Sequence, residues 1–241
     1  DRVQDAYSLR CIPQVLGPVR DTVAFARGYI ERTLNAAIDN PLIFESDGKE
    51  PYLCISGGNF HGEGLAFMMD FLSIAMSDVA GISERRVFAL LTPALNYGLP
   101  SMLIPANGLN TGLMVAQYAA AALVSDNKTL AHPDSVDSIP TSADQEDHVS
   151  MGSISALKLL TVLQNVEQVL AVEFLTAAQA LDFRAPLKPG HGVWLALRFL
   201  RGRISHANQD YEVRNDLHAC AGILRRGELA SQVEAEIGPL A

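Results

Sequence analysis

The sequence is poor in cysteine and in positive charge, and each shortage excludes a class of protein. Its 241 residues include three cysteines, Cys11, Cys54 and Cys220, and none belongs to a Cys-x-x-Cys pair. A zinc ribbon or a disulfide framework is therefore not indicated, and we expect a reducing, cytoplasmic setting. Lys and Arg number 18 against 27 Asp and Glu, which gives a formal net charge of -9. The basic residues are also scattered, which argues against a nucleic-acid partner.

Targeting and membrane signals are missing as well. The first residues, Asp1 to Asp5, do not form a signal peptide, and no uninterrupted apolar run reaches the roughly 18 residues of a membrane span. We therefore expect no membrane partner. The sequence does not begin with Met, from which we expect that upstream residues have been lost or removed.

Apolar residues at helical spacing dominate what is present. They predict helices over about residues 62–91, 112–131 and 148–183. The last helix would span roughly 50 Å at 1.5 Å per residue. A helix of that length favours a bundle whose members pack across subunits. The fold class that we expect is therefore all-α.

Polar loops that contain glycine connect these helices, and loops of this kind commonly carry chemistry. They cover residues 39–59, 98–110 and 133–147. We divide the chain into a central helical bundle with active-site loops, residues 1–185, and a peripheral helical cap, residues 186–241.

The first candidate motif is Gln4-Asp5-Ala6-Tyr7-Ser8-Leu9-Arg10. Tyr7 and Arg10 are three residues apart, so they share a face if the segment is helical. A guanidinium group can hold a carboxylate through two parallel hydrogen bonds, and a phenol beside it can act as a base. The pair would suit an amino-acid site. On spacing alone, an ordinary amphipathic turn fits at least as well.

The second motif is Gly57-Gly58-Asn59-Phe60-His61-Gly62-Glu63. Adjacent glycines let the backbone approach a ligand closely, and Phe60 could then pack on a flat group. His61-x-Glu63 is part of the zinc deaminase pattern, but the required Pro-Cys-x-x-Cys is absent, so we predict no zinc. A Gly-rich turn before a helix is the alternative.

The third motif is Ser142-Ala143-Asp144-Gln145-Glu146-Asp147-His148. Adjacent side chains point in different directions and rarely converge on one ion, so we predict no metal here. Two interpretations stay open. The acids favour a solvated helix N-terminus, or Glu146 faces a pocket and binds a polar or cationic substrate group.

Six segments together closely resemble the ammonia-lyase and aminomutase family that uses a methylidene-imidazolone (MIO) electrophile. In order and at compatible spacing, they are Gln4–Arg10, Leu34–Pro41, Gly57–Gly62, Ser83–Arg86, Gly108–Gly112 and Ser138–Met151. Six blocks are far more specific than one. The resemblance implies a long-helix bundle of the ammonia-lyase (fumarase/aspartase-like) type and a homotetramer whose active sites draw on several chains.

The third motif is similar to the histidine-specific branch of that family. Aromatic ammonia-lyases usually have Gln at the position of Glu146. A carboxylate can accept a hydrogen bond from an imidazole N–H and stabilise its charged form, whereas it offers a phenyl ring nothing. The resemblance therefore implies that Glu146 engages the imidazole of L-histidine, with Gln145 also at the substrate.

Further roles follow from the resemblance. The substrate amine adds to the MIO electrophile, Arg10 binds the carboxylate, and Tyr7 is the base that removes the β-proton. Gln4 supports the polar network at the substrate. Phe60 packs near the cofactor or the substrate ring, and Tyr7 also lies at the cofactor. Elimination would release ammonia and leave trans-urocanate.

The sequence departs from the family in one large respect. MIO resembles a cyclisation product of Ala-Ser-Gly, and this triplet is absent. We therefore expect the chain alone to be inactive and to need an N-terminal half, whether lost by truncation, cleaved off or encoded as a separate subunit. Smaller departures are Asp144, Met102 and a long stretch from Glu45 to Ile55, to which we assign no function.

Two other functions stay open. One is a tyrosine or phenylalanine ammonia-lyase or aminomutase, and the other is a non-catalytic helical scaffold or partner subunit.

Overall fold

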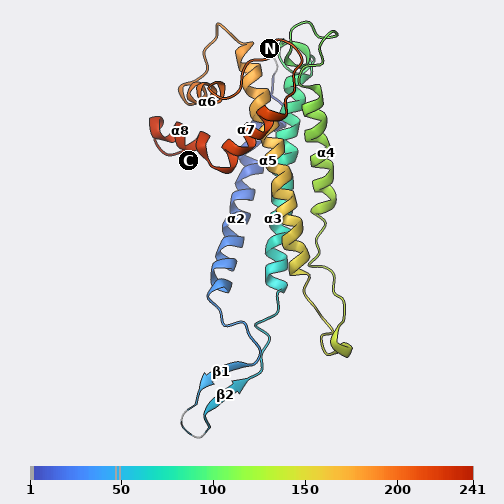
Figure 1. Ribbon diagram of the computed structural model, residues 1–241, viewed down its shortest axis with the longest axis vertical. Helices are drawn as coiled ribbons and strands as arrows, with labels where there is room; N and C mark the ends of the chain where they lie inside the picture. Colours follow the sequence, from blue (N-terminus) through green and yellow to red (C-terminus); the bar gives the residue numbers. More distant parts are fainter. Residues whose placement is uncertain (1–2, 47, 49, 241) are drawn as a thin grey trace. The chain divides into compact units, whose positions relative to one another are not determined.

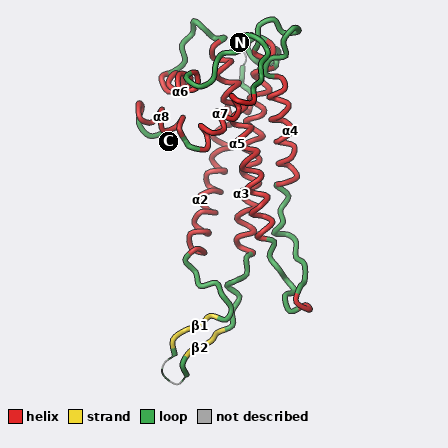
Figure 2. The backbone as a smooth tube through the Cα atoms, viewed as in Figure 1, coloured by secondary structure: helices red, strands yellow, loops and turns green. Residues whose placement is uncertain are grey.

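The computed structural model describes residues 3–46, 48 and 50–240, and helices dominate this part of the chain. The described residues form eight α-helices, two short 3-10 turns and one hairpin, and Figures 1 and 2 label the longer helices and the two strands. The helices are α1 (Tyr7–Arg10), α2 (Ile12–Leu34), α3 (Glu63–Leu91), α4 (Met114–Leu130), α5 (Gly152–Asp182), α6 (His191–Arg201), α7 (Arg214–Arg225) and α8 (Glu228–Ile237). The strands are β1 (Leu42–Glu45) and β2 (Tyr52–Ile55), and the 3-10 turns are η1 (Ser101–Leu103) and η2 (Ser142–Asp144). The predicted helical fold class is confirmed.

The three predicted helices are present as α3, α4 and α5, with ends within a few residues of the expected ones. Their broad apolar faces made them visible in the sequence. The region after Gly190 forms α6, α7 and α8, and α6 and α7 each contact α8.

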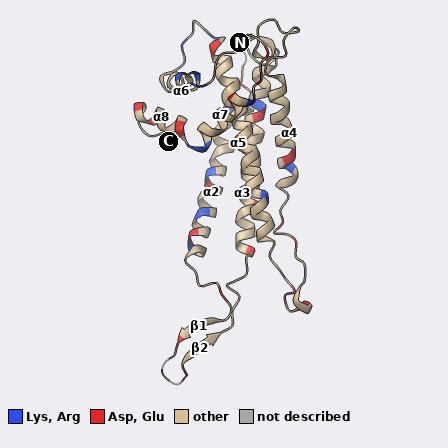
Figure 3. Cartoon of the chain, viewed as in Figure 1, with Lys and Arg blue, Asp and Glu red and all other residues tan. Residues whose placement is uncertain are grey.

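Helix α2 was not predicted, although apolar residues recur every three or four positions from Val15 to Ile30. It buries only Val19 and Ala26, and it contains Pro18 in its interior. A proline removes one backbone donor from the helical ladder. Charged residues of both signs alternate along α2 (Figure 3), and Arg27 forms an exposed ion pair with Glu31 at 3.3 Å.

The hairpin of β1 and β2 was also not predicted. The strands are antiparallel, with Leu42 opposite Ile55 and Glu45 opposite Tyr52. Seven of their eight residues are exposed, so no buried face imposes an alternating pattern. The hairpin contains most of the long stretch from Glu45 to Ile55 that the sequence left unexplained.

The chain forms two compact units that interleave along the sequence. The first unit contains Asp1–Val15, Ser77–Thr129 and Leu163–Ala241, and the second contains Leu16–Met76 and Leu130–Val162. The division at residue 185 into bundle and cap stays a prediction.

The core of the first unit combines aliphatic side chains with a few bonded polar ones. Its buried aliphatic residues include Val87, Leu103, Ile104, Val166, Val169, Leu175, Ile204 and Ile223. Gln179 is buried among them, and its amide donates to the carbonyl oxygens of Leu103 at 3.1 Å and Ala207 at 2.8 Å. Buried amides without partners are costly, so this side chain fixes both loops to α5.

A second polar anchor in the first unit joins the segment before α7 to the segment before α4. The carboxylate of Asp210 accepts hydrogen bonds from the backbone N–H groups of Thr111 and Gly112 and from the Thr111 hydroxyl, at 2.7–3.0 Å. These bonds lower the pKa of Asp210, with the Thr111 backbone bond contributing most. The Gly108–Gly112 block of the sequence is thus held by Asp210, from the segment before α7.

The second unit has a smaller core with a buried carboxylate. Ala26, Ala66, Met68, Leu159 and Val162 are buried there. Asp70 on α3 is also buried, and it accepts a hydrogen bond from the backbone N–H of Ser135 at 2.8 Å. This bond ties the start of the third polar loop to α3.

Helix α3 is the one helix in the described part of the chain that is long and apolar enough to cross a membrane. An 18-residue window within it has a mean hydropathy of 1.6. Core helices of soluble proteins meet the same criterion, so this is weak evidence for a membrane span. Asp70, Ser73, Ser83 and Glu84 are buried along α3, as expected for a helix that packs within protein.

Within the second unit, α2 and α3 approach closely at Gly64. A Cβ atom built on Gly64 would overlap the phenol group of Tyr29, with the Tyr29 Cε1 atom at 3.0 Å. We expect Gly64→Ala to lower the free energy of unfolding by about 1–3 kcal/mol, as overpacking does. Chemical denaturation followed by circular dichroism would measure the change.

Gly81→Ala is the matched control on the same helix, because nothing lies within 4 Å of its built Cβ. This variant should be stabilised by roughly 0.5–1 kcal/mol through helix propensity. Equal changes in the free energy of unfolding for Gly64→Ala and Gly81→Ala would contradict the close approach of α2 and α3 at Gly64.

Candidate active site

The first motif forms a single helical turn that brings Tyr7 and Arg10 together. The guanidinium carbon of Arg10 lies 4.4 Å from the centre of the Tyr7 ring, so the two side chains share a face as their spacing predicted. The Tyr7 side chain is 70% exposed. Gln4 lies just before this turn and is exposed. The turn therefore presents a phenol, a cation and an amide to the outside of the first unit.

A buried ion pair lies behind this turn. Arg86 on α3 binds both carboxylate oxygens of Glu173 on α5, and the Ser83 hydroxyl donates to the same carboxylate at 2.6 Å. Arg86 also donates to the carbonyl oxygen of Ser8, at 3.4 Å. The Ser83–Arg86 block of the sequence thus contacts the back of the Tyr7 turn.

The second and third motifs meet in the second unit through two histidines. The Nε2 atom of His61 lies 2.9 Å from the carbonyl oxygen of His148, and the two rings stack with centres 5.8 Å apart. A carbonyl oxygen only accepts, so His61 carries its proton on Nε2. Its Nδ1 atom then accepts from the backbone N–H of Glu63, at 3.4 Å.

The second motif also closely approaches the residues that follow the third motif, next to these histidines. A Cβ atom on Gly62 would lie 2.9 Å from the Ser150 hydroxyl oxygen, and one on Gly152 would lie 3.3 Å from the Gly62 carbonyl oxygen. Glycine at both positions permits this approach. The loop that carries Phe60 and the loop that carries Glu146 are therefore joined at their bases.

Glu146 is held at the end of a tight turn. Its backbone pairs with that of Thr141, and the Thr141 hydroxyl donates to its Oε2 atom at 2.5 Å. Between them, Ser142, Ala143 and Asp144 all have positive φ angles of 50–65°. Three consecutive left-handed residues are strained for L-amino acids, and such strain is often found at functional loops.

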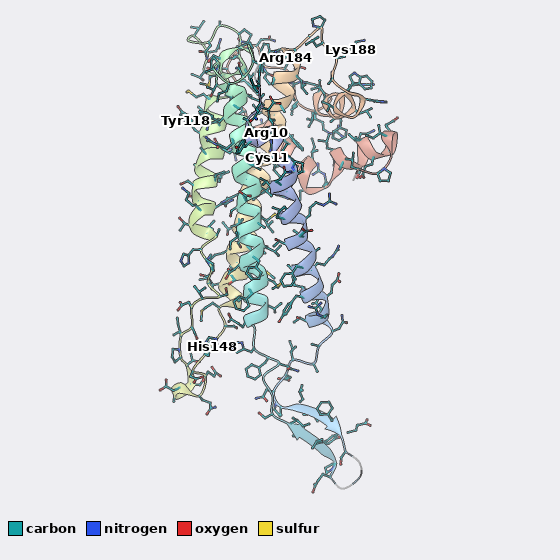
Figure 4. All side chains as sticks on the ribbon, turned by 180° about the vertical axis from the view of Figure 1, so that it is seen from behind. Arg10, Cys11, Tyr118, His148, Arg184 and Lys188 are labelled. Atoms are coloured by element: carbon teal, nitrogen blue, oxygen red, sulfur yellow. The ribbon has the colours of Figure 1, made fainter. Side chains whose placement is uncertain are left out.

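The six predicted site residues fall into two groups. Gln4, Tyr7 and Arg10 belong to the first unit. Phe60, Gln145 and Glu146 belong to the second unit, and all three are exposed, Phe60 by 55%. Figure 4 labels Arg10 from the first group and His148 from the loop of the second. That all six form a single site stays a prediction.

Metal ligands do not cluster in the described residues, where no group of three or more His, Cys, Asp or Glu side chains could hold an ion. In the third motif, the Glu146 carboxylate accepts a hydrogen bond from the Thr141 hydroxyl.

A family model described as aromatic amino acid lyase matches residues 1–201. The chain belongs to this family. Histidine ammonia-lyase of Caldanaerobacter subterraneus subsp. tengcongensis is 53% identical over 235 residues, which are 98% of this chain and 45% of the relative. The chain spans just under half the length of the curated relatives that it matches.

Solved structures agree with the family assignment. Histidine ammonia-lyase from Trypanosoma cruzi superposes with a TM-score of 0.90 at 42% identity, over 96% of this chain and 45% of that one. Tyrosine aminomutase from Streptomyces globisporus also gives 0.90 at 41% identity, over 98% of this chain and 44% of that one. The predicted resemblance to lyases and aminomutases and the fold that it implied are confirmed.

Several residues that shape these lyase motifs were missed by the sequence analysis. Thr141 donates to Glu146 within one loop, His61 bonds to the loop of His148, and Glu173 lies within a long helix. The polar residue Thr141 before a turn is a weak local signal for such a bond. For Glu173 the sequence offers none, because its partners are about 90 positions away.

Proposed function

We propose that this chain forms the C-terminal part of a histidine ammonia-lyase, which eliminates ammonia from L-histidine to give trans-urocanate. The pairing of Tyr7 with Arg10 on one exposed turn carries the proposal. Together they place a carboxylate-binding cation and a proton acceptor close enough for one amino-acid substrate to contact both. The histidine ammonia-lyase names of the curated relatives support the choice of reaction.

Arg10 and Tyr7 act on different groups of the substrate. The guanidinium group of Arg10 binds the α-carboxylate and so fixes the adjacent carbon atoms. The Tyr7 Oη atom, as the phenolate, takes the proton from the β-carbon and so becomes a neutral phenol. Gln4, just before the turn, completes the polar surroundings.

Glu146 is the residue that we assign to the imidazole. The bond from Thr141 engages its Oε2 atom and fixes the carboxylate before substrate arrives. A carboxylate that is already oriented loses less conformational freedom on binding. Gln145 lies beside it, and the ring of Phe60 offers an apolar surface to the substrate or to the cofactor.

MIO is the cofactor that the family implies, and it supplies an electrophile for the substrate amino group. The residues present fit it, because the rings of Tyr7 and Phe60 are both largely exposed and free to lie against a group supplied by another segment. No Ala-Ser-Gly triplet exists in the sequence. We infer that another polypeptide segment provides MIO, that this chain alone is inactive, and that no metal takes part.

A tyrosine- or phenylalanine-specific lyase or aminomutase is the second candidate. The tyrosine aminomutase superposes as well as the histidine ammonia-lyase does, so the backbone fold favours neither. The charge of Glu146 favours histidine, because a phenol or phenyl ring has no cationic form to stabilise.

Assembly and location complete the proposal. Exposed aromatic rings gather on α2 and α3 of the second unit, where Phe25 and Phe71 lie 6.5 Å apart and Phe67 stacks on Phe71 at 6.1 Å. On α5, Ile154, Leu157 and Leu160 are exposed at three-residue spacing. Exposed apolar patches of this kind mark interaction surfaces, and we infer a homotetramer. Three free cysteines suit the cytoplasm.

The substrate can be tested by joining the chain to its own upstream coding sequence or to the matching part of the Caldanaerobacter relative. Ultraviolet spectra with L-histidine, L-tyrosine and L-phenylalanine should reveal urocanate from histidine only, with the chain alone silent. Glu146→Gln should lower kcat/KM for histidine by about 10–100-fold, because a hydrogen bond to a charged group is lost.

Other outcomes would overturn different parts of the proposal. Cinnamate or coumarate as the product would exclude the role of Glu146 and leave the family unchanged. Silence with all three substrates would favour a non-catalytic scaffold.

The role of Tyr7 can be tested in the same joined enzyme. Tyr7→Phe should reduce kcat by roughly 10²–10⁴-fold, the usual effect of removing an acid–base group. Thermal denaturation should change little, since Tyr7 is mostly exposed. Turnover near that of the parent enzyme would remove Tyr7 from the role of base.

The tetramer can be tested by light scattering coupled to gel filtration. The joined enzyme should have four times the mass of one chain, and Leu157→Glu should shift it towards smaller species, because a charge would be placed on an apolar contact surface. A monomeric parent protein would contradict the assembly.

A further inference from the structure

The turn that carries Tyr7 and Arg10 is poorly held by apolar packing. None of the residues of α1 is buried. A cavity of about 350 Å³ lies against the turn within the first unit, and apolar side chains line most of it, among them Leu9, Leu90, Leu95 and Leu181. Since a cavity lacks the close contacts that fix a side chain in a core, other interactions have to determine where this turn lies.

Two polar contacts fix the turn, one on each side. The phenol of Tyr97 donates to the Oδ1 atom of Asp5 at 2.8 Å, just before the turn. Arg86 donates to the carbonyl oxygen of Ser8 at 3.4 Å, within it. The Tyr97 bond is the shorter one, and each of the two bonds has one charged partner, the Asp5 carboxylate or the Arg86 guanidinium.

Tyr97 is itself held in an uncommon conformation. Its φ angle is 57°, in the left-handed region that residues other than glycine seldom adopt. Arg184, just after α5, donates to the carbonyl oxygens of Asn96 at 3.0 Å and Tyr97 at 3.1 Å. The buried amide of Asn96 donates to the carbonyl oxygens of Leu90 and Leu99, both at 3.1 Å. Such strain persists where the surroundings over-determine it.

We propose that Tyr97 is a positioning residue for the Tyr7–Arg10 turn, and that Arg184 orients it by binding the backbone of the loop. A rigid element, the end of α5, is thereby connected to the reactive turn through Arg184, Tyr97 and Asp5. Figure 4 labels Arg184 and, on the turn itself, Arg10. An effect of Tyr97 on catalysis rests on the proposed function, whereas its effect on the position of the turn does not.

Hydrogen exchange followed by mass spectrometry tests whether Tyr97 and Arg184 hold the turn in place. The measurement uses the chain joined to its upstream segment. Tyr97→Phe removes one oxygen atom and should speed exchange of the amides of residues 4–11 about tenfold, as loss of one hydrogen bond to a carboxylate would. Arg184→Gln should have the same local effect, and Arg184→Lys, which keeps a cationic donor, should restore slower exchange. Tyr118→Phe, at an exposed tyrosine of α4 in the same unit, is the control and should change nothing there.

Kinetics test the catalytic part with a double-mutant cycle. Tyr97→Phe should lower kcat/KM about tenfold at an unchanged Tm, and Asp5→Ala should do the same. If Tyr97 acts through Asp5, the double variant should be no worse than either single variant. If the two reductions in kcat/KM multiplied in the double variant, Tyr97 would not act through Asp5.

The failures of the two proposals are distinguishable. Faster exchange at residues 4–11 in a protein without lyase activity would retain the positioning role and reject the proposed reaction. Unchanged exchange and unchanged kcat/KM in an active Tyr97→Phe enzyme would reject the positioning role alone.

Discussion

The ion pair between Arg86 and Glu173 is the interaction on which the first unit depends most. It joins α3 to α5 through two hydrogen bonds, and Ser83 supplies a third to the same carboxylate. Both side chains are more than four-fifths shielded from solvent. Removal of one partner would leave an uncompensated buried charge, which is far more costly than the pair itself is stabilising. The pair therefore acts chiefly as a constraint on the relative register of the two helices.

This register has consequences for the chemistry, because Arg86 also reaches the carbonyl oxygen of Ser8. The turn that presents Tyr7 and Arg10 thus rests on charged groups of the long helices and only slightly on apolar contacts. In the second unit a comparable function falls to His61 and Thr141, which fix the loops of Phe60 and Glu146. In both units, hydrogen bonds to backbone or carboxylate groups orient the loops, and the apolar helices form the core to which the loops are attached.

Apolar periodicity predicted α3, α4 and α5, because a helix that buries a broad face repeats its apolar residues every three or four positions. It did not predict α2 or the hairpin. Helix α2 does carry apolar residues at helical spacing, but only two of its residues are buried and Pro18 lies in its interior, whereas the hairpin exposes nearly every side chain. An exposed hairpin has no buried face, so its strands show no alternation of apolar and polar residues in the sequence.

By itself, the sequence determined the family, the helical fold and the residue types of the candidate site, because six spaced blocks and a helical repeat are local properties of the chain. It also determined that Tyr7 and Arg10 share a face, since three residues make one turn. Only the tertiary structure showed that Thr141 bonds to Glu146, that His61 bonds to the loop of His148, and that Tyr97 bonds to Asp5 and Glu173 to Arg86. Apart from Thr141 and Glu146, which are five positions apart, these bonds join residues about 90 positions apart, and no local pattern encodes such a distance.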